Sequence, residues 1–428
     1  MSSASTSAPS PSHEIGNVAC PFCGLTCDDL VVARDGGRLC VRANGCPISV
    51  SAFEQASLPR DAEPRVGGRA ATLPEAAAEA ARLLRGARQP LFAGLATDVA
   101  GARAAGRLAD RCGGVLDHMN SPAVLRNILV LQDGGWMTTT LSEVRNRADL
   151  LVVAGSDITR RFPRFFERCI ANRETLFGTD RRCEVVFVGS DVPEGLTLPG
   201  PAPAAIPCAP ARLPEAFGLL RALVAGRAVQ AREVAGVPLP VWMELAGRMR
   251  SARYGVVAWA AADLDFPHAD LAVQAICELV MDLNRTTRFS GLPLGGSDGD
   301  ITSDNVHVWQ TGYGFRTSFG CGFPEADAYL YSAPRLLEGG EADVLVWISS
   351  FDPTRGPPRS TVPTVVLGRA GMALDREPEV FVPVGTPGID HAGHLFRTDR
   401  VVTLPLRRLR DSALPSVAQV LDAIEAAL

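Results

Sequence analysis

The sequence predicts an α/β protein with two or more doubly wound βαβ domains and a small Cys-rich N-terminal domain. From about residue 60, short apolar runs of strand length alternate with helical patterns, and this plan recurs in the second half of the chain. A cluster of cysteines precedes both halves. Because 428 residues exceed what one hydrophobic core usually fills, we expect at least two domains.

The N-terminal cysteines follow the spacing of a thiolate metal site. Cys20, Cys23 and Cys27 are separated by two and then three residues, and Cys46 follows downstream. Three thiols so close in sequence can turn toward one point, and a fourth from a returning loop completes a tetrahedron. The pattern fits a 4Fe–4S cluster, a zinc ion, or a relic site with free thiols. Cys40 could replace Cys46, but the Asn-Gly turn before Cys46 favours Cys46.

The first half of the chain predicts alternating helices and buried strands. A helix is expected where alanines lie between Pro74 and Gly86, and apolar runs ending in Gly-Ser-Asp are typical of buried parallel strands. A Pro-rich linker then follows at 193–214. The expected helices are 73–88 and 99–111, and the expected strands are 91–95, 150–154 and 185–188.

The second half repeats the plan and contains one short internal repeat. Ala148-Asp149-Leu150-Leu151-Val152-Val153 is similar to Ala342-Asp343-Val344-Leu345-Val346-Trp347. The expected elements are strands 255–260, 344–348 and 364–367 and helix 270–283. We therefore predict a Cys-rich domain at 14–60, a first α/β domain at 61–210 and a second at 211–428, with facing crevices at the strand ends.

Composition excludes several functional classes. A net charge of −5 gives no indication of nucleic-acid binding. No apolar run approaches the roughly 20 residues of a membrane span. Residues 1–13, rich in Ser, Ala and Pro, predict a disordered tail and no secretory signal. Eleven cysteines without such a signal indicate a reducing cytoplasm, and the absence of lysine excludes a lysine Schiff base.

Two stretches make the chain resemble the B subunit of formylmethanofuran dehydrogenase, in the molybdopterin oxidoreductase superfamily. The resemblance covers most of the chain and implies a fold of that superfamily's type. It also implies a 4Fe–4S cluster on the N-terminal cysteines and a bis-pterin guanine dinucleotide that carries tungsten or molybdenum between the α/β domains. The two stretches are Cys20 to Leu30 and Leu131-Gln132-Asp133-Gly134-Gly135-Trp136, which continues through Leu141 to Asp149 and on to Phe162-Pro163-Arg164.

The sequence departs from that family where the redox metal would be held. The family's cysteine ligand stands eight residues before Leu-Gln-Asp and is followed by His-Gly-Pro, whereas this chain has Ala123, Val124 and Leu125 there. An alanine methyl cannot coordinate tungsten, and no imidazole remains to relay a proton. The segments expected to hold the guanine ends are also altered, at Asp191-Val192-Pro193 and Leu367-Gly368-Arg369, and the family's Glu-Gly-Thr segment near the C-terminus is Ala392-Gly393-His394 here.

This pattern is similar to the B subunit of the bacterial formyltransferase/hydrolase complex of methylotrophs. The resemblance implies a protein that supports assembly, without a redox step, in tetrahydromethanopterin-linked C1 metabolism that takes the formyl group to formate. Its implied partners are an amidohydrolase-type A subunit, a formyltransferase-type subunit and the C subunit of the same complex. We predict that molybdopterin or tungstopterin is absent. The alternative is an active tungsten or molybdenum formate/CO2 oxidoreductase in which solvent or sulfide replaces the thiolate at Ala123.

We predict no catalytic residue in this chain, because it has no Gly-x-Ser-x-Gly elbow. The basic run Arg160, Arg161, Arg164 and Arg168 could bind phosphate or the acidic tail of a furan cofactor, but a solvated helix face or a contact between subunits is favoured. For His391 and His394 we favour loop packing over zinc binding. The loop 295–300 resembles a phosphate loop only loosely, and the aromatic segment 309–314 is expected to pack the empty crevice.

Overall fold

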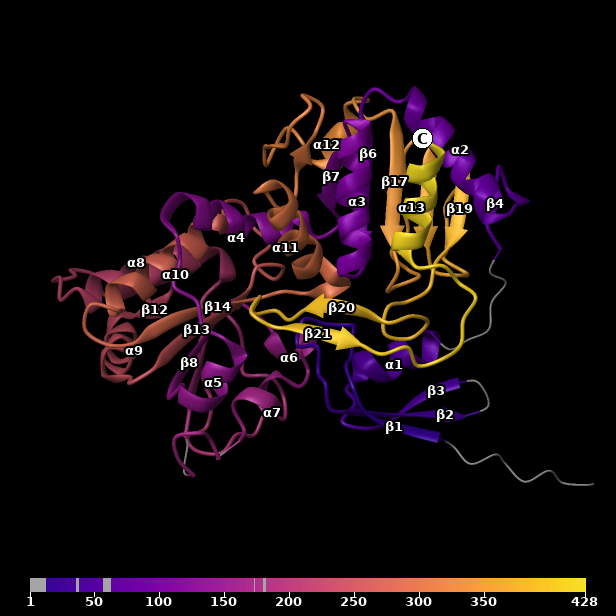
Figure 1. Cartoon of the computed structure of the whole chain (residues 1–428). Coiled ribbons are helices and arrows are strands. Elements are labelled where there is room, and N and C mark those ends of the chain that lie inside the picture. Colours follow the sequence, from indigo (N-terminus) through magenta and orange to yellow (C-terminus); the bar gives the residue numbers. More distant parts are fainter. Residues whose placement is uncertain (1–12, 36–37, 57–62, 173, 180–181) are drawn as a thin grey trace, which may run out of the picture.

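The computed structural model describes residues 13–35, 38–56, 63–172, 174–179 and 182–428. The tail predicted for residues 1–13 lies outside these ranges except for His13, which begins the first strand. Figure 1 shows a small N-terminal sheet beside two larger α/β bodies, each built on its own sheet. This arrangement confirms the predicted mixed α/β fold with a Cys-rich N-terminal part.

The N-terminal part is a three-stranded antiparallel sheet followed by one helix. The cysteine segment 19–29 forms the long connection between its first two strands, and Cys46 immediately precedes the helix. The elements are β1 (His13–Val18), β2 (Leu30–Asp35), β3 (Arg38–Ala43) and α1 (Pro47–Ala56).

The first body contains a nine-stranded sheet whose five central strands run parallel. Their side chains are buried almost without interruption, because helices cover the sheet and neither face meets water. In order across the sheet, the strands are β16 (Glu325–Ala326), β15 (Thr317–Ser318), β7 (Val115–His118), β6 (Pro90–Ala96), β17 (Val344–Ser349), β18 (Thr364–Gly368), β19 (Val380–Pro383), β4 (Arg65–Val66) and β5 (Arg69–Ala70).

Three helices with small side chains pack on one face of this sheet (Figure 1). Thr72 and Glu75 form a capping box at the start of the first helix, which fixes where it begins. Its alanines meet valines and leucines of the strands, so the helix axes can lie close to the sheet. The helices are α2 (Leu73–Gly86), α3 (Val99–Cys112) and α13 (Val417–Ala427); α12 (Ala333–Glu338) contributes Leu336 to a separate core cluster with the strands.

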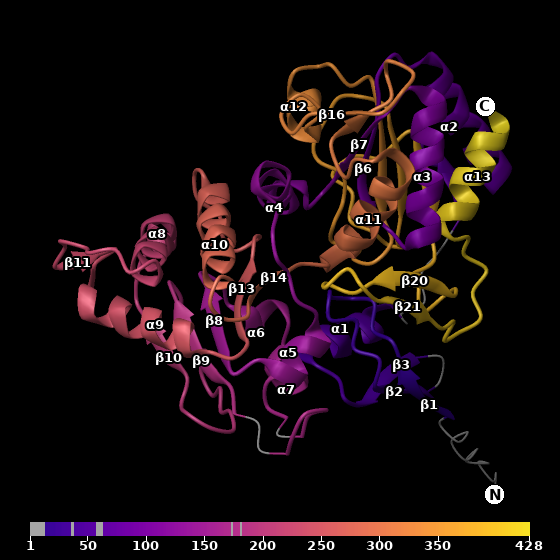
Figure 2. The same ribbon diagram turned by 60° about the vertical axis from the view of Figure 1, so that its left-hand side comes forward.

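The second body is a five-stranded, fully parallel sheet. Its strands, in order, are β10 (Ala204–Ile206), β9 (Glu184–Val188), β8 (Leu150–Ala154), β13 (Gly255–Ala260) and β14 (Phe289–Leu294). One core cluster contains side chains of α4 (Ser121–Gly134), α8 (Leu213–Val224), α9 (Leu239–Ser251) and α10 (Ala269–Leu283); the other contains those of α5 (Leu141–Arg147), α6 (Ile158–Arg161), α7 (Phe165–Cys169) and the cysteine segment. Figure 2 shows α8 and α10 set apart from α5 and α7.

The two bodies do not follow the predicted domain boundaries at 61–210 and 211–428. Strands from 65–118 and 317–383 form the nine-stranded sheet, and strands from 150–294 form the five-stranded one. The second body is therefore inserted into the first. Residue 210 lies inside the second body, between β10 and α8. Periodicity identifies a buried strand but not its distant partner, and β6 pairs with β17 across more than half of the chain.

Most elements expected from sequence occur within a few residues of their predicted ranges. The two repeated segments become β8 and β17, each in the middle of its own sheet. The Pro-rich linker also contains β10 and a short 3-10 helix, Pro210–Arg212. Elements without a prediction include α11 (Asp300–Thr311), the hairpin of β20 (Gly393–Phe396) and β21 (Thr403–Leu406), and the ribbon of β11 (Glu233–Val234) and β12 (Val237–Pro238). Within the described ranges, we find no helix with the length and apolar character needed to cross a membrane.

Candidate functional site

A cavity of about 600 Å³ lies between the two bodies. Residues just after the carboxyl ends of β7, β13 and β14 line it, as is usual for ligand crevices of open parallel sheets. Phe22 and Cys23 of the N-terminal segment contribute another part of the wall. The cavity therefore brings together all three parts of the chain.

The altered ligand position faces this cavity. Ala123 and Val124 lie in the first turn of α4 and line the cavity, as Pro122 does. Cys23 is the only thiol among the described residues that line the cavity, and it belongs to the N-terminal segment. Where the resemblance implies a thiolate on a redox metal, the wall is formed by methyl groups.

A polar wall centred on Asn120, the residue just before α4, adjoins this methyl-lined part of the cavity. Asn120 Nδ2 donates to Asp300 Oδ2 at 3.1 Å, and its Oδ1 accepts from Arg355 Nη2 at 2.9 Å. Burial raises the pKa of the Asp300 carboxyl to about 7, although Asn120 opposes the shift. Burial also raises the pKa of Asp298, against the nearby charge of Arg355. Asp300 can therefore take up or release a proton near neutral pH.

His118 anchors the loop that carries this wall. Its Nδ1 accepts from the Asn120 amide at 2.9 Å, and its Nε2 lies 3.2 Å from the Asp298 carbonyl oxygen, to which it can donate. The ring stacks on Phe315 with a centroid distance of 5.0 Å. Because burial lowers the pKa of His118 to about 3, the ring stays neutral at physiological pH and serves to position Asn120.

Arginines on the remaining walls are paired within the protein. Arg160 and Arg161 both contact the Asp263 carboxylate. Arg126 donates to the Ala261 carbonyl oxygen at 2.7 Å and to Asp265 at 2.9 Å. The front half of the predicted basic run therefore faces the crevice, with two arginines sharing one carboxylate.

The predicted cysteine ligands come together next to the crevice. Cys20, Cys23 and Cys27 are buried, and the Cys20 amide donates to the Cys27 carbonyl oxygen at 2.8 Å. Burial raises the pKa of Cys23 to about 12 and that of Cys20 well above its usual value, and the neighbouring thiols, including Cys46, add to both shifts. Cys46 is close enough to act on both thiols, whereas Cys40 does not contribute to these shifts.

The four thiols as they lie do not form a metal-binding group. Among the residues that the structure describes, no three His, Cys, Asp or Glu side chains are arranged to hold a metal ion. Ser49 engages Cys46, because the Ser49 amide donates to the sulfur at 3.5 Å and its hydroxyl accepts from the Cys46 amide. A 4Fe–4S cluster or zinc on Cys20, Cys23, Cys27 and Cys46 stays a prediction.

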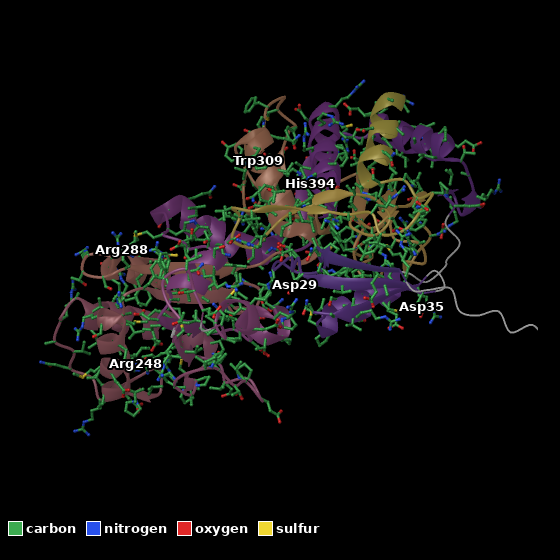
Figure 3. All side chains as sticks on the ribbon, turned by 60° about the horizontal axis from the view of Figure 1, so that its bottom comes forward. Asp29, Asp35, Arg248, Arg288, Trp309 and His394 are labelled. Atoms are coloured by element: carbon green, nitrogen blue, oxygen red, sulfur yellow. The ribbon has the colours of Figure 1, made fainter. Side chains whose placement is uncertain are left out.

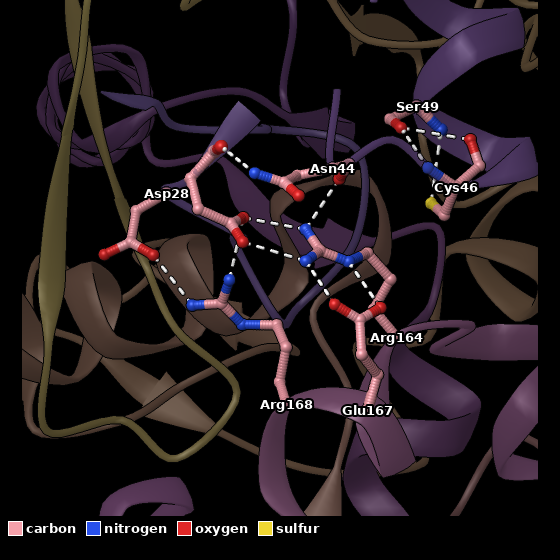
Figure 4. A network of polar contacts seen from close by, with 8 residues as sticks. Asp28, Asn44, Cys46, Ser49, Arg164, Glu167 and Arg168 are labelled. Carbon is pink, nitrogen blue, oxygen red and sulfur yellow. Dashed lines mark hydrogen bonds and ion pairs between the residues drawn. The ribbon is translucent and has the colours of Figure 1, made fainter. Parts of the chain in front are cut away.

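Two arginines of the basic run fasten the cysteine segment to α7 (Figure 4). Arg164, only 5% exposed, donates to both oxygens of Asp29 at 2.7 and 2.8 Å and also to Glu167. Arg168 contacts Asp28 and Asp29. Burial alone would raise the pKa of Asp29, but these two guanidinium groups hold it below its usual value. This contact is internal, which neither reading of the basic run anticipated.

The other motifs from the sequence have mainly structural roles. Gly24 lies so close to the backbone of Gly295 that an added Cβ would approach its carbonyl oxygen to 1.8 Å. Trp309 is 65% exposed, packs edge-on against Phe396 and does not line the crevice, so its expected packing role there is wrong. His391 packs against its own loop through the carbonyl oxygens of Ala392 and Gly385.

Sequence reasoning missed Asn120 and Arg355 of the polar wall, and it compared the loop 295–300, which contains Asp300, only with a phosphate loop. Each lies just after a strand or at the start of a helix, where parallel sheets place functional side chains. Asn120 directly precedes Ser-Pro at the start of α4, and Arg355 follows Asp-Pro-Thr after β17. Those turn signals could have identified them as crevice residues.

Relatives of known name match nearly the whole chain. The B subunit of the tungsten-containing formylmethanofuran dehydrogenase 2 of Methanocaldococcus jannaschii is 28% identical over 93% of this chain and 94% of its own length. The B subunit of the formyltransferase/hydrolase complex of Methylorubrum extorquens is 30% identical over 79% of this chain and 89% of its own length. No family model matches the chain.

Solved structures agree with the sequence comparison. A chain of the Methylorubrum extorquens formyltransferase/hydrolase complex, solved with methylofuran, matches with a TM-score of 0.72 and 29% identity, over 85% of this chain and 98% of that one. Acetylene hydratase of Pelobacter acetylenicus shares the fold, with a TM-score of 0.62 at 9% identity, over 96% of this chain and 69% of that one. The chain therefore belongs to the family formed by the B subunits of formylmethanofuran dehydrogenases and of the formyltransferase/hydrolase complex.

Proposed function

We propose that this chain is the B subunit of a formyltransferase/hydrolase complex in tetrahydromethanopterin-linked C1 metabolism. In this role it supports assembly and has no redox activity of its own. Formyl transfer and hydrolysis to formate take place on an amidohydrolase-type A subunit and a formyltransferase-type subunit, with the C subunit in the same assembly. We place the complex in the cytoplasm, because eleven free cysteines suit a reducing compartment.

The observation that carries the proposal is Ala123 on the wall of the crevice. A redox metal in this family type needs a soft protein ligand at that position, and a methyl group has no lone pair to donate. Val124 beside it also lacks a group that could move a proton. The paired arginines and the Asn120 wall support a crevice that joins the two bodies.

The cysteine quartet has a structural task under this proposal. The N-terminal part is too short to bury much apolar surface by itself, so it relies on docking against the second body. A bound cluster or zinc ion would strengthen that docking by linking Cys20, Cys23 and Cys27 to Cys46. Arg164 and Asp29 already perform part of this task.

The test is purification of the native complex through a tag on this chain, with mass spectrometry and metal analysis. We expect an amidohydrolase-type and a formyltransferase-type protein to co-purify, formyl hydrolysis in the assembly, and no stoichiometric tungsten, molybdenum or pterin. Matched metal analysis of a Cys23→Ala complex would report whether iron or zinc belongs to the quartet.

A chain that stays monomeric in its native extract would contradict the proposal. Stoichiometric tungsten or molybdenum with viologen-linked formate oxidation would instead establish the oxidoreductase reading.

A further inference from the structure

A second concave surface lies where the strands of the second body begin, at the edge of the sheet opposite to the crevice. This groove, of about 480 Å³, is lined by residues near the starts of β8, β13 and β14 and by the turn 175–178. Figure 3 shows Arg288, one of its residues, on the outer part of the molecule, far from Trp309 and His394. The groove is thus separate from the crevice and from the cysteine segment.

Residues within 141–149, part of the stretch that resembles the family, form one side of this groove. Asn146 Oδ1 accepts from the Leu176 amide at 2.9 Å, which holds the turn in place. The Arg147 guanidinium lies 4.5 Å above the Phe177 ring and pairs with Glu143. Asp149 accepts from the amides of Arg253 and Tyr254. The motif therefore presents a turn with an exposed aromatic ring beside a row of basic residues.

Two guanidinium charges on the basic side of the groove are not offset by an acid among the described residues. Arg253 and Arg288 are exposed, and neither has an ion-pair partner among the described residues. Asp149, the only acid among the described residues that line the groove, already accepts two backbone hydrogen bonds. In a chain with a net charge of −5, two free guanidinium groups that line one groove mark a place suited to a negatively charged ligand.

The opposite rim is apolar. Leu176 is 82% exposed and Phe177 62%, although both are large hydrophobic side chains. Thr175 and Gly178 bond to each other and close the turn, so these side chains are presented on a defined support. Exposed aromatic and aliphatic groups next to arginines are typical of protein interfaces. An inorganic anion would make no favourable contact with the apolar rim.

We propose that this groove docks an acidic segment of another protein of the complex. Carboxylates of that segment pair with Arg253 and Arg288, and an apolar side chain of it covers Phe177 and Leu176. The proposal rests on the proposed function, since it needs the chain to work within an assembly. To that function it adds the surface of this chain that contacts a partner and the chemical character of the partner segment.

The experiment uses the whole complex, tagged on this chain and carrying Arg253→Glu and Arg288→Glu together. Retention of each partner is measured by native mass spectrometry along a gradient of NaCl. We expect one partner to be held about tenfold more weakly and to dissociate at lower salt, because reversed rim charges repel an acidic segment. The matched pair is Arg288→Glu alone and Arg69→Glu, which each reverse one charge; Arg69 is exposed at the far edge of the nine-stranded sheet, and its variant should behave as wild type.

Two further variants separate docking from folding and from bulk charge. Leu176→Ser with Phe177→Ser should weaken retention of the same partner while the salt dependence stays as in wild type. Arg253→Lys with Arg288→Lys keeps the charge and should restore most of the binding. Equal weakening by Arg69→Glu would overturn the assignment, because the effect would then come from net charge.

Retention of every partner by the Arg253→Glu/Arg288→Glu complex, as in wild type, would overturn the groove assignment alone. Binding of inorganic phosphate that requires both arginines, with assembly unchanged, would overturn it in favour of a small-anion site. A wild-type chain that captures no other protein of the complex would refute the proposed function and the groove with it.

Discussion

The two α/β bodies use the same device at the start of their central strands. Asp149, before β8, accepts hydrogen bonds from the amides of Arg253 and Tyr254, which lead into β13, at 2.8 and 3.0 Å. Asp343, before β17, accepts from the amides of Arg88 and Gln89, which lead into β6, at 2.7 and 3.1 Å. In both bodies, an aspartate fixes the neighbouring parallel strand to the central one.

The opposite ends of these strands differ. After β8, the Ser156 hydroxyl accepts from the Ala260 amide at 2.9 Å and donates to the Ala154 carbonyl oxygen. After β17, the Ser350 hydroxyl donates to the Ala96 carbonyl oxygen, which the Ser350 amide also contacts. Ser156 therefore provides the partner of a buried amide, whereas Ser350 adds a second hydrogen bond to a carbonyl oxygen that already accepts one. The repeated sequence thus sets the strand, while its neighbours decide how much each side chain contributes.

Each body is also completed by a different end of the chain. The N-terminal segment packs on the second body and is held by the buried Arg164, whereas α13 packs on the first body, where Arg107 reaches Asp422 and Glu425 at the surface. Buried, multiply bonded arginines contribute more to stability than exposed ones. Loss of the N-terminal contact should therefore cost more than loss of the C-terminal one.

The largest effect is expected from Asp300, whose carboxyl is buried although it accepts hydrogen bonds from the Ile301 amide and the Asn120 side chain. Its pKa of about 7 lies above the unfolded value of about 4, so the folded state binds the extra proton. Stability is full below about pH 4 and falls as the pH rises to about 7. Asp300→Asn should abolish this fall, a difference on the order of 2 to 4 kcal/mol at about pH 8. Denaturant unfolding at a series of pH values measures it; parallel pH profiles for both proteins would contradict it.

Gly24→Ala comes next, because its Cβ would overlap the backbone of Gly295, which cannot rotate away. We expect a loss of about 3 kcal/mol and a detached N-terminal segment, measured by thermal unfolding and by protease cleavage within residues 13–56. Gly16→Ala is the control, since nothing lies within 4 Å of its added Cβ. Equal melting temperatures for the two variants would show that the close approach does not constrain the fold.

The two terminal contacts can be compared directly with Arg164→Met and Arg107→Met. The first should cost about 2 kcal/mol, because it removes hydrogen bonds to Asp29 and Glu167 from a buried site. The second should cost less than about 1 kcal/mol, because its partners are solvated. Urea unfolding of both variants measures the difference, and a reversed order would break the comparison between chain ends.

The smallest difference concerns the paired serines. Ser156→Ala leaves the buried Ala260 amide without its partner and should cost about 1 to 2 kcal/mol. Ser350→Ala leaves the Ala96 carbonyl oxygen still bonded to an amide and should cost about 0.5 kcal/mol. Hydrogen exchange at the Ala260 amide should accelerate in the first variant only; unchanged protection there would mean that water replaces the hydroxyl.

Local pattern was enough to predict β6, β17 and β18 of the first body and β8, β9 and β13 of the second, because burial on two faces leaves uninterrupted apolar runs such as Leu150–Ala154. The insertion of the second body into the first was not predictable in this way. Which sheet a strand joins depends on distant pairing, as between Pro90 and Val344. The cysteine cluster was visible from spacing alone. The contact of Arg164 with this segment was not predictable, because its partner Asp29 lies 135 residues away in the sequence. A run of arginines does not indicate which acid each of them contacts.

The Gly24 carbonyl oxygen accepts a hydrogen bond from the Thr398 amide at 2.8 Å. The core around the cysteines also includes Ile389 and Leu409. During synthesis, the thiols are made early and can be enclosed only after nearly the last residues have been added, roughly 20 to 75 seconds later at usual ribosome speeds. Throughout that interval they are open to oxidants and to metal carriers. Any loading of the quartet is thus easiest on the nascent chain, before the C-terminal segment closes over it.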